Sequence, residues 1–414
     1  MLKWWFAVPL WKRILVALVL GVAVGLVFRE QAVHVKVLGD IFVRLIRMVV
    51  APLVFTMIAA GVASLADSRR LGSLGAKTLT LFVCTAAVAV AVGMGVGTIF
   101  EPGFGANISK AAPQLIDPGR TIGDQLLGLI PLNPVKAMAD GDMLAIIVFA
   151  IFVGSGILVA GPRAAPLAAV LDATSAVMLH IVKFVMEVAP FGVFGLVATA
   201  IGANGPAVFI NIGLLALCVV IASAVQSLIV HGLLLRLVAR LPVTPFYLSI
   251  LDAIVVAFST ASSSATLPVA MTVAERNLKL GKPIISTVLP LGASIGRDGT
   301  ALYVGLLAMF SAQVLGVELG PVQYVMILIT ATLVALGTAP VPSASLFMLA
   351  AVLSTLGIPD ERTALIVGFI LPFDRLLDMI RTVPNATCNL AVATTVARFE
   401  NEIDVEAYRK APHE

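Results

Sequence analysis

The chain has few charged residues: only 12% of its 414 residues are Asp, Glu, Lys or Arg, about half the share of an average soluble domain. Apolar residues make up 60% of the chain and give a mean hydropathy of +1.06. A water-soluble globule of this length could not bury so much apolar surface. The three cysteines form no CxxC pair, which excludes a disulfide scaffold. The sequence therefore predicts an integral membrane protein.

The net charge is also small, +4 from 27 basic and 23 acidic residues, and no basic run is long enough to bind nucleic acid. Lys3, Lys12 and Arg13 flank the first apolar segment, and Arg69 and Arg70 follow the second. Because basic residues favour the cytoplasmic side, we expect the amino terminus to be inside and the loop around Arg29–Lys36 to be outside. We further expect a multi-pass protein of the plasma (inner) membrane whose carboxyl terminus is also cytoplasmic. No cleavable signal is expected, since no small-residue cleavage site follows the first apolar segment.

Apolar segments long enough to cross a bilayer, which takes about 20 residues, follow one another with short breaks. The first six lie at about 8–28, 37–66, 73–100, 134–160, 166–201 and 206–239. Residues 101–132 are polar and rich in glycine and proline, which predicts an external loop. Several segments exceed one perpendicular crossing, so we expect tilted or broken helices.

Two later apolar stretches are interrupted by polar, helix-breaking tips. Residues 245–268 contain the run Ser259–Ser264, and residues 322–358 contain the run Gly337–Ser345. Irregular backbone at membrane depth is tolerated only where protein buries it or a wet cavity exposes it. Paired re-entrant hairpins therefore fit both stretches and indicate a transporter site near the midplane. Ordinary helices with serine-lined packing faces and a proline kink remain the alternative.

Charged and polar residues also stand inside the last apolar stretches. Arg297 and Asp298 are adjacent in a glycine-rich break within 285–315, where charges are costly and indicate function, unless they form an internal salt bridge that fixes packing. At 100° per residue, six polar residues of 362–397 fall within one sector of about 100°: Asp374, Asp378, Arg381, Thr382, Asn385 and Asn389. Such a stripe faces a wet cavity or polar partners, or else forms a purely structural network.

The stripe has the chemistry of a binding site. Arg381 can form a bidentate fork with a carboxylate, and Asp378, one turn away, can accept hydrogen bonds from an ammonium group. Helix amino termini at the hairpin tips suit a second carboxylate. Together these groups match an acidic amino acid. No Ser-His-Asp order, metal-ligand spacing or phosphate loop is present, and the four histidines lie outside these motifs, so we expect no enzyme activity and no cofactor.

Four motifs in order resemble the dicarboxylate/amino acid:cation symporter family, the glutamate and aspartate transporter homologues. They are SSSATLP at 262–268, GRDGTALY at 296–303, GTAPVPSAS at 337–345 and DRLLDMIRTVPNATCN at 374–389. The resemblance covers nearly the whole chain. It implies an all-α, elevator-type transporter with eight transmembrane helices and two re-entrant helical hairpins, which forms a homotrimer in the lipid bilayer.

The same resemblance implies a division of the chain and roles for single residues. Scaffold helices would lie in 1–70 and 104–203, transport-domain elements in 71–103 and 204–400, and a cytoplasmic tail in 401–414. Substrate contacts would come from Ser262, Ser263, Thr300, Asp378, Arg381, Thr382 and Asn385. Val341 and Ser345 would form a gate at the second hairpin, stiffened here by Pro340 and Pro342. Asp378 would take the amino group and Arg381 the side-chain carboxylate.

The chain departs from the family at the sodium ligands. Gly296, Arg297 and Asn389 replace an asparagine, a methionine and a carboxylate, and Phe82 and Ala86 replace two hydroxyl residues. Sodium needs hard oxygen ligands, and Asp298, Thr85 and Asn385 are the side chains that remain. We therefore expect transport without sodium, with Arg297 acting as a tethered cation beside Asp298, and with Asp374 in the same coupling region.

Several alternatives stay open. Arg297 could swing away and leave one sodium site, or a proton could couple to transport through Asp374 or Asp378. The substrate could be a C4-dicarboxylate, although an unpaired buried Asp378 would repel it. A further alternative is an anion channel, which would have no need of an amino-acid-shaped constellation.

Overall fold

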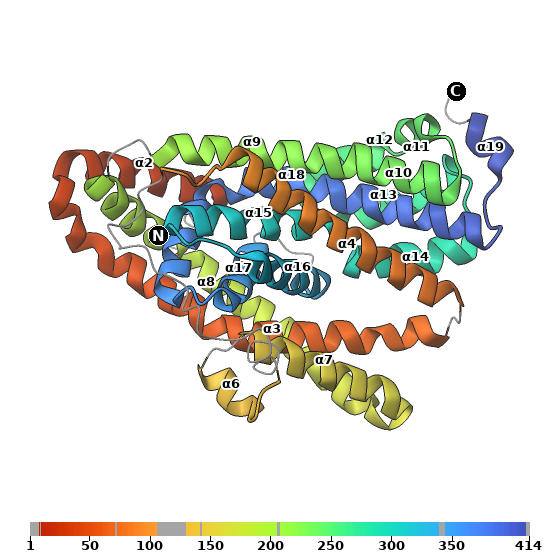
Figure 1. The fold of residues 1–414 in the computed structure, drawn as a ribbon, viewed down its shortest axis with the longest axis horizontal. Coiled ribbons are helices and arrows are strands. Elements are labelled where there is room, and N and C mark those ends of the chain that lie inside the picture. Colours follow the sequence, from red (N-terminus) through yellow and green to blue (C-terminus); the bar gives the residue numbers. More distant parts are fainter. Residues whose placement is uncertain are drawn as a thin grey trace.

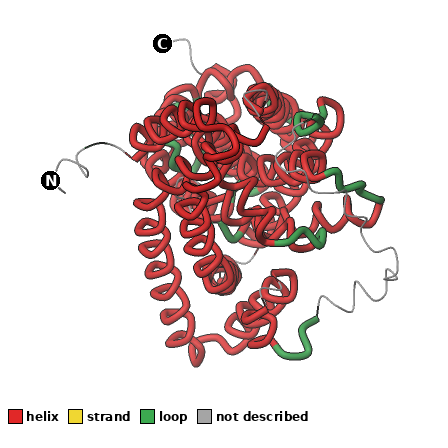
Figure 2. The backbone as a smooth tube through the Cα atoms, turned by 90° about the vertical axis from the view of Figure 1, so that its left-hand side faces the viewer, coloured by secondary structure: helices red, strands yellow, loops and turns green. Residues whose placement is uncertain are grey.

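The fold is helical throughout the described part of the chain. In the computed structural model the described residues are 8, 10–70, 73–105, 130–140, 143–204, 208–338 and 344–410. Figure 2 shows helices joined by loops, with no strand drawn among these residues. The β-type pairing found within them is one isolated bridge between Leu280 and Ile403.

Four long helices form a first packing group. It contains α2 (Leu10–Phe28), α3 (Lys36–Arg70), α7 (Met143–Ala160) and α8 (Ala165–Asn204), with the short elements η1 (Arg29–Val35), η2 (Gly161–Ala164) and α6 (Pro134–Asp140). The long helix α8 packs along both α2 and α3, and α3 packs along α7. An ion pair of 2.6 Å between Arg13 Nη1 and Glu187 Oε2 joins α2 to α8.

A second packing group surrounds α18 (Asp360–Phe399), which runs lengthwise through the molecule in Figure 1. α14 (Lys282–Ile295) and α15 (Asp298–Leu315) both pack on α18, and α4 (Ser73–Phe100) packs along α15. Only Gly296 and Arg297 separate α14 from α15, and neither is helical. The predicted break is therefore present, and it lies against the helix that carries the polar stripe.

One helix of this group is locally unwound into π-helix. α9 (Val208–Ala224) continues into η3 (Val225–Val230), α10 (His231–Leu233) and η4 (Leu234–Ala239), of which η3 and η4 are π-helical. This continuous rod packs against α18. Single π-turns inside α-helices are rare and occur frequently at functional sites.

Both predicted hairpins contain two short helices that pack on each other. The first has arms α12 (Leu251–Thr260) and α13 (Ser263–Arg276), preceded by α11 (Val243–Ser249) at an angle of 51° to α12. Its turn is made by Ala261 in a left-handed conformation, φ 51°, and by Ser262. The second has arms α16 (Pro321–Leu336) and α17 (Ala344–Thr355), and its tip lies outside the described residues. The first hairpin packs on α18 and the second on α15.

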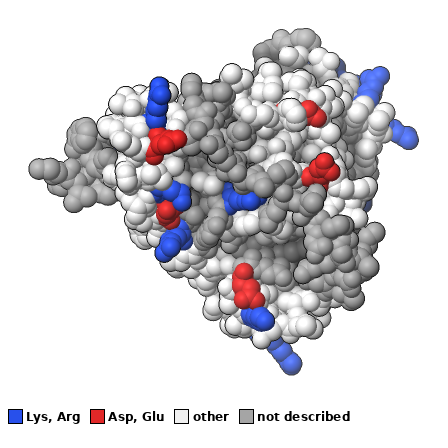
Figure 3. Space-filling model, turned by 60° about the vertical axis from the view of Figure 1, so that its left-hand side comes forward, with Lys and Arg blue, Asp and Glu red and all other residues white. Residues whose placement is uncertain are grey.

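The distribution of side chains is that of a protein immersed in lipid. Large apolar side chains are exposed on the outer helices, including Val27, Ile99 and Ile210 at 73–76%. Charged side chains are sparse on the face drawn in Figure 3, whereas five charged residues around α18 are almost fully buried. Among the described residues, five helices are long and apolar enough to cross a membrane, or six if the bent α11–α12 pair counts as one span. The count of eight, the re-entry of the hairpins and the scaffold-transport division stay predictions.

The segment predicted as a tail is folded as far as Lys410. α19 (Val405–Lys410) packs on α11, and the hydroxyl of the buried Tyr408 donates to the Pro242 carbonyl at 2.8 Å. Just before it, Glu400 forms an ion pair of 2.7 Å with Lys77 at the start of α4. The end of α18 is thereby fastened to the helices around it.

Candidate functional site

The polar stripe of α18 is buried along its whole length. Each of its six residues is at most 6% exposed: Asp374, Asp378, Arg381, Thr382, Asn385 and Asn389. The 40-residue helix is unbroken through Pro384, so the 3.6-residue period carries the stripe over several turns on one face. The stripe faces protein, as its chemistry requires, and the contacts of its members define the candidate site.

Arg381 is the centre of the most highly charged part of the site. Its Nη2 lies 2.7 Å from Asp378 Oδ1, and its guanidinium lies over the ring of Tyr303, 4.9 Å from the centroid. The hydroxyl of Tyr303 donates to Asp374 Oδ1 at 2.9 Å. A buried guanidinium is thus held by an acid on its own helix and an aromatic ring on α15.

Neighbouring stripe residues connect the site to α15. The Thr382 hydroxyl donates to the carbonyl oxygen of Asp378 at 2.6 Å, and Asn385 Oδ1 accepts from the backbone N–H of Gly299 at 2.8 Å. Thr300 Oγ1 lies 3.5 Å from Arg381 Nη1. The approach of α15 to α18 depends on the missing side chain of Gly299, because a Cβ there would overlap the carbonyl oxygen of Arg381.

The hairpin residues that the sequence singled out lie in different surroundings. Ser262 is half-buried and caps α13, since its hydroxyl accepts from the Ala265 N–H at 3.3 Å. Ser263 is buried and accepts from Arg297. Ser345, at the start of α17, is fully buried, and its hydroxyl has no hydrogen-bond partner among the described residues. Val341, Pro340 and Pro342 lie outside the described residues.

Arg297 does not pair with Asp298, and this part of the sequence prediction is wrong. Its guanidinium donates to Ser263 Oγ at 3.0 Å and to the carbonyl oxygens of Ala293 and Ser294 at 2.8 and 3.2 Å. The side chain therefore turns back over the end of α14 towards the first hairpin. Arg381 and Asp378 of α18 lie close enough to act on its charge.

The carboxylate of Asp298 is hydrogen-bonded instead by hydroxyl, amide and imidazole side chains. Its Oδ1 accepts from the Thr85 hydroxyl at 3.1 Å, and its Oδ2 lies 2.8 Å from both Gln226 Nε2 and His231 Nε2. The other ring nitrogen of His231 lies 3.1 Å from the Thr387 hydroxyl. All of these side chains are at most 5% exposed. They form a closed hydrogen-bond network between four helices.

His231 and Gln226 are site residues that the sequence analysis missed. The prediction that the histidines lie apart from the motifs is wrong for His231, which touches the aspartate of the 296–303 motif. Gln226, Ser227 and His231 interrupt the apolar run 206–239, and this interruption was the signal available. Polar residues inside a membrane segment require partners, and here the partner is Asp298.

Most of the side chains at the expected sodium positions are engaged by protein partners or are apolar. Both carboxylate oxygens of Asp298 already receive donors, and Asn385 Oδ1 is engaged by Gly299. Phe82 and Ala86 contribute only carbon and are fully buried. Asn389 Oδ1 is buried and receives no donor from the described residues, but it is a single neutral oxygen beside Gly296, where a Cβ would overlap it. A hard cation needs several oxygen ligands.

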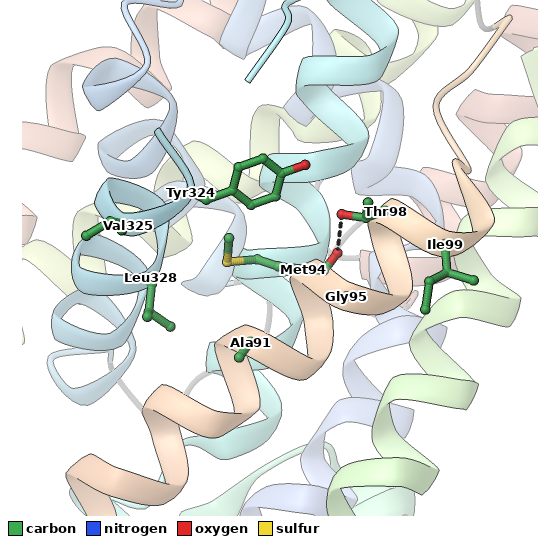
Figure 4. A pocket seen from close by; sticks show the side chains of 8 residues that line it. All are labelled: Ala91, Met94, Gly95, Thr98, Ile99, Tyr324, Val325 and Leu328. Carbon is green, nitrogen blue, oxygen red and sulfur yellow. Dashed lines mark hydrogen bonds between the residues drawn. The ribbon is translucent and has the colours of Figure 1, made fainter. Parts of the chain in front are cut away.

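A groove elsewhere on the molecule has a different character. Figure 4 shows it between α4 and α16, with side chains such as Met94, Ile99, Val325 and Leu328. Its volume is about 430 Å³. The hydroxyl of Thr98, which also lines it, is bonded to the Met94 carbonyl at 2.9 Å. This lining offers no charged group for a polar substrate, and the candidate site stays at the stripe of α18.

The chain is similar to known proteins over nearly its whole length. Residues 10–399 match the model of the sodium:dicarboxylate symporter family. The chain is 34% identical to the proton/sodium-glutamate symport protein of Bacillus subtilis (strain 168), over 94% of this chain and 92% of that protein. It is 33% identical to the C4-dicarboxylate transport protein of Anaeromyxobacter sp. (strain K), over 95% and 90%. It is 34% identical to C4-dicarboxylate transport protein 2 of Bradyrhizobium sp. (strain ORS 278), over 97% and 91%.

Proposed function

Because the chain belongs to the sodium:dicarboxylate symporter family, a family of transporters and not of enzymes, we propose that it is a secondary transporter of acidic amino acids, aspartate or glutamate. The observation that supports this best is the buried Arg381–Asp378 pair on α18. The carboxylate of an amino-acid substrate can take the place of Asp378 beside Arg381, and its ammonium group can take the place of Arg381 beside Asp378. The two buried charges then stay compensated during binding.

The same charge pairing assigns the remaining residues of the proposed pocket. Arg381 binds the side-chain carboxylate, Asp378 the ammonium group, and Thr382 and Asn385 border the substrate on α18, with Thr300 opposite on α15. Ser262 and Ser263 line it from the first hairpin, and Val341 and Ser345 close it from the second. The Ser345 hydroxyl, which has no hydrogen-bond partner in the part of the chain that the structure describes, is a group that a substrate oxygen would satisfy.

A C4-dicarboxylate is the second candidate. Two of the relatives carry that substrate class in their names. In this chain, moreover, Asp378 is ion-paired with Arg381 rather than unpaired, so its repulsion of a dianion is weaker than the sequence alone suggested. A dicarboxylate would nevertheless compete with Asp378 for Arg381 and would offer that acid no ammonium group, which favours the amino acid.

The two candidates are separated by binding to the purified protein. We expect L-aspartate or L-glutamate to bind at least about tenfold more tightly than succinate, because only the amino acids supply the ammonium group that compensates Asp378. Calorimetry in detergent and uptake of labelled substrate into proteoliposomes measure this. Equal affinity for succinate would remove the role given to Asp378, and flux that fails to saturate would favour a channel.

We also propose that transport does not depend on sodium. The support is the occupied hydrogen-bond shell of Asp298, in which Thr85, Gln226 and His231 stand where cation ligands would be needed. This replaces the tethered-cation explanation, since Arg297 points elsewhere. Aspartate affinity should be the same within about twofold in sodium, potassium and choline media of equal ionic strength. A steep rise of affinity with sodium would contradict the proposal, and a proton gradient applied in the same vesicles tests the remaining coupling.

The family relationship suggests the setting in which this transport occurs. We propose a homotrimer in the plasma (inner) membrane, with both termini cytoplasmic, in which the second packing group moves as an elevator against the first. The extensive packing within each group supports two bodies of this kind. The mass of the detergent-solubilised protein, and labelling of single cysteines placed at the termini, test assembly and orientation.

A further inference from the structure

Among the described residues, Arg297 is a buried cation without a carboxylate partner. Its side chain is 3% exposed, and no acid lies within ion-pair distance of it among the described residues, whereas Arg381 has Asp378 at 2.7 Å. A buried charge is costly unless a counter-charge compensates it. Arg381 also lies close enough to repel its charge, and Asp378 close enough to attract it. An anion bound beside Arg297 would compensate the buried charge.

The guanidinium of Arg297 also has N–H groups that no described residue accepts. Each terminal nitrogen carries two N–H groups, and the structure accounts for one on Nη1, to Ser263 Oγ, and one on Nη2, to the Ala293 carbonyl. One N–H on each nitrogen has no acceptor within the part of the chain that the structure describes. Two N–H groups on neighbouring nitrogens are the fork that binds a carboxylate in bidentate fashion.

The surroundings of this fork suit an anion as well. Ser263 is the first residue of α13, a helix of 14 residues whose amino end points its free N–H groups and partial positive charge at the hairpin tip. A cavity of about 10 Å³, the size of one water molecule, lies beside Ser263 between α13, α14 and α18. The donors that adjoin Arg297 on this side are therefore the Ser263 hydroxyl and the amino end of α13.

We propose that Arg297, with Ser263 and the amino terminus of α13, binds the α-carboxylate of the substrate, so that each of the two buried arginines holds one carboxylate. This assignment rests on the proposed function and extends it, because it gives Arg297 a substrate-binding role that the proposed pocket does not include. The substrate class is then a four- or five-carbon molecule with carboxylates at both ends, anchored at Arg297 and Arg381.

Three ligands distinguish the proposed roles of Arg297 and Arg381. L-aspartate has both carboxylates, L-asparagine lacks the charge at the side chain, and β-alanine lacks the α-carboxylate. Purified Arg297→Met protein should bind aspartate and asparagine about 10- to 100-fold more weakly than wild type, the loss expected for charge-assisted hydrogen bonds, and should bind β-alanine unchanged. Arg381→Ala protein should instead lose affinity for aspartate and keep that for asparagine.

Two further variants show whether a loss of binding is specific to the fork of Arg297. Arg236→Met removes an exposed arginine of η4 and should bind all three ligands as wild type does. Arg297→Lys retains the charge but not the fork, so an intermediate loss for aspartate is expected, and this variant serves if Arg297→Met does not purify as a folded protein. Aspartate binding within twofold of wild type in Arg297→Met, or equal losses for all three ligands, would overturn the assignment. Failure of the wild type to bind any acidic amino acid would instead count against the proposed function.

Discussion

Replacing Arg381 with alanine should abolish the binding and uptake of acidic amino acids. The substitution removes the bidentate donor for the side-chain carboxylate and leaves Asp378, which is 4% exposed, without its cation. Truncating one partner of a buried, hydrogen-bonded charge pair costs about 2 to 5 kcal/mol, so affinity should fall by at least about 30-fold. Titration calorimetry with L-aspartate measures the loss directly, and uptake into proteoliposomes should drop to background.

Two comparisons show whether that loss is specific. Arg381→Lys keeps a positive charge near Asp378 but lacks the planar fork, and we expect it to recover only part of the affinity. Arg236→Ala, at an exposed position of η4, should bind aspartate normally. Unchanged affinity in Arg381→Ala would remove the whole pocket assignment, because every other role was placed around this residue.

Replacing Gly299 with alanine should damage the site through packing rather than charge. The new Cβ would overlap the carbonyl oxygen of Arg381 and lie 3.2 Å from Asn385 Oδ1, so α15 and α18 must move apart. That movement breaks the bond from the Gly299 N–H to Asn385 and displaces Arg381. Forcing a group into a packed core costs about 1 to 3 kcal/mol, sometimes more. We expect a melting temperature several degrees lower and strongly reduced aspartate uptake.

The matched control is the same substitution where space exists. A Cβ at Gly213, in α9, would meet nothing within 4 Å, and alanine is favoured over glycine in a helix by about 1 kcal/mol. Gly213→Ala should therefore unfold at the same or a higher temperature and transport as wild type does. If Gly299→Ala behaved in the same way, the close approach of α15 to α18 would not be needed for the site.

The helical periodicity of the sequence predicted the parts of this molecule that form regular helices. The six polar residues of α18 share one face because 3.6 residues make a turn, and burial of that face follows from the cost of exposing it to lipid. The break between α14 and α15, and the turn at Ala261–Ser262, were recognisable because glycine and serine clusters do not continue an apolar helix. Each of these features depends on local sequence alone.

The errors occurred where the backbone leaves that regularity. Arg297 has φ −121° and ψ 38° at the start of α15, a conformation that helical periodicity does not describe, so the direction of its side chain could not be inferred from its neighbour Asp298. His231 was missed because its partner, Asp298, is 67 residues away in the chain. Long-range pairs of this kind are decided by tertiary packing, and a single sequence contains no record of it.

The π-helical turns before and after α10 have a consequence for how this protein is aligned with others. Residues five apart lie about 140° apart around an α-helix, but in η3 the extra residue in the turn brings Gln226 and His231 to the same side, with their nitrogens 3.4 Å apart. A π-turn amounts to one residue inserted into an α-helix. In a homologue without that insertion, an ungapped alignment would place one of the two partners of Asp298 on the wrong face, and a one-residue gap near position 228 would restore both.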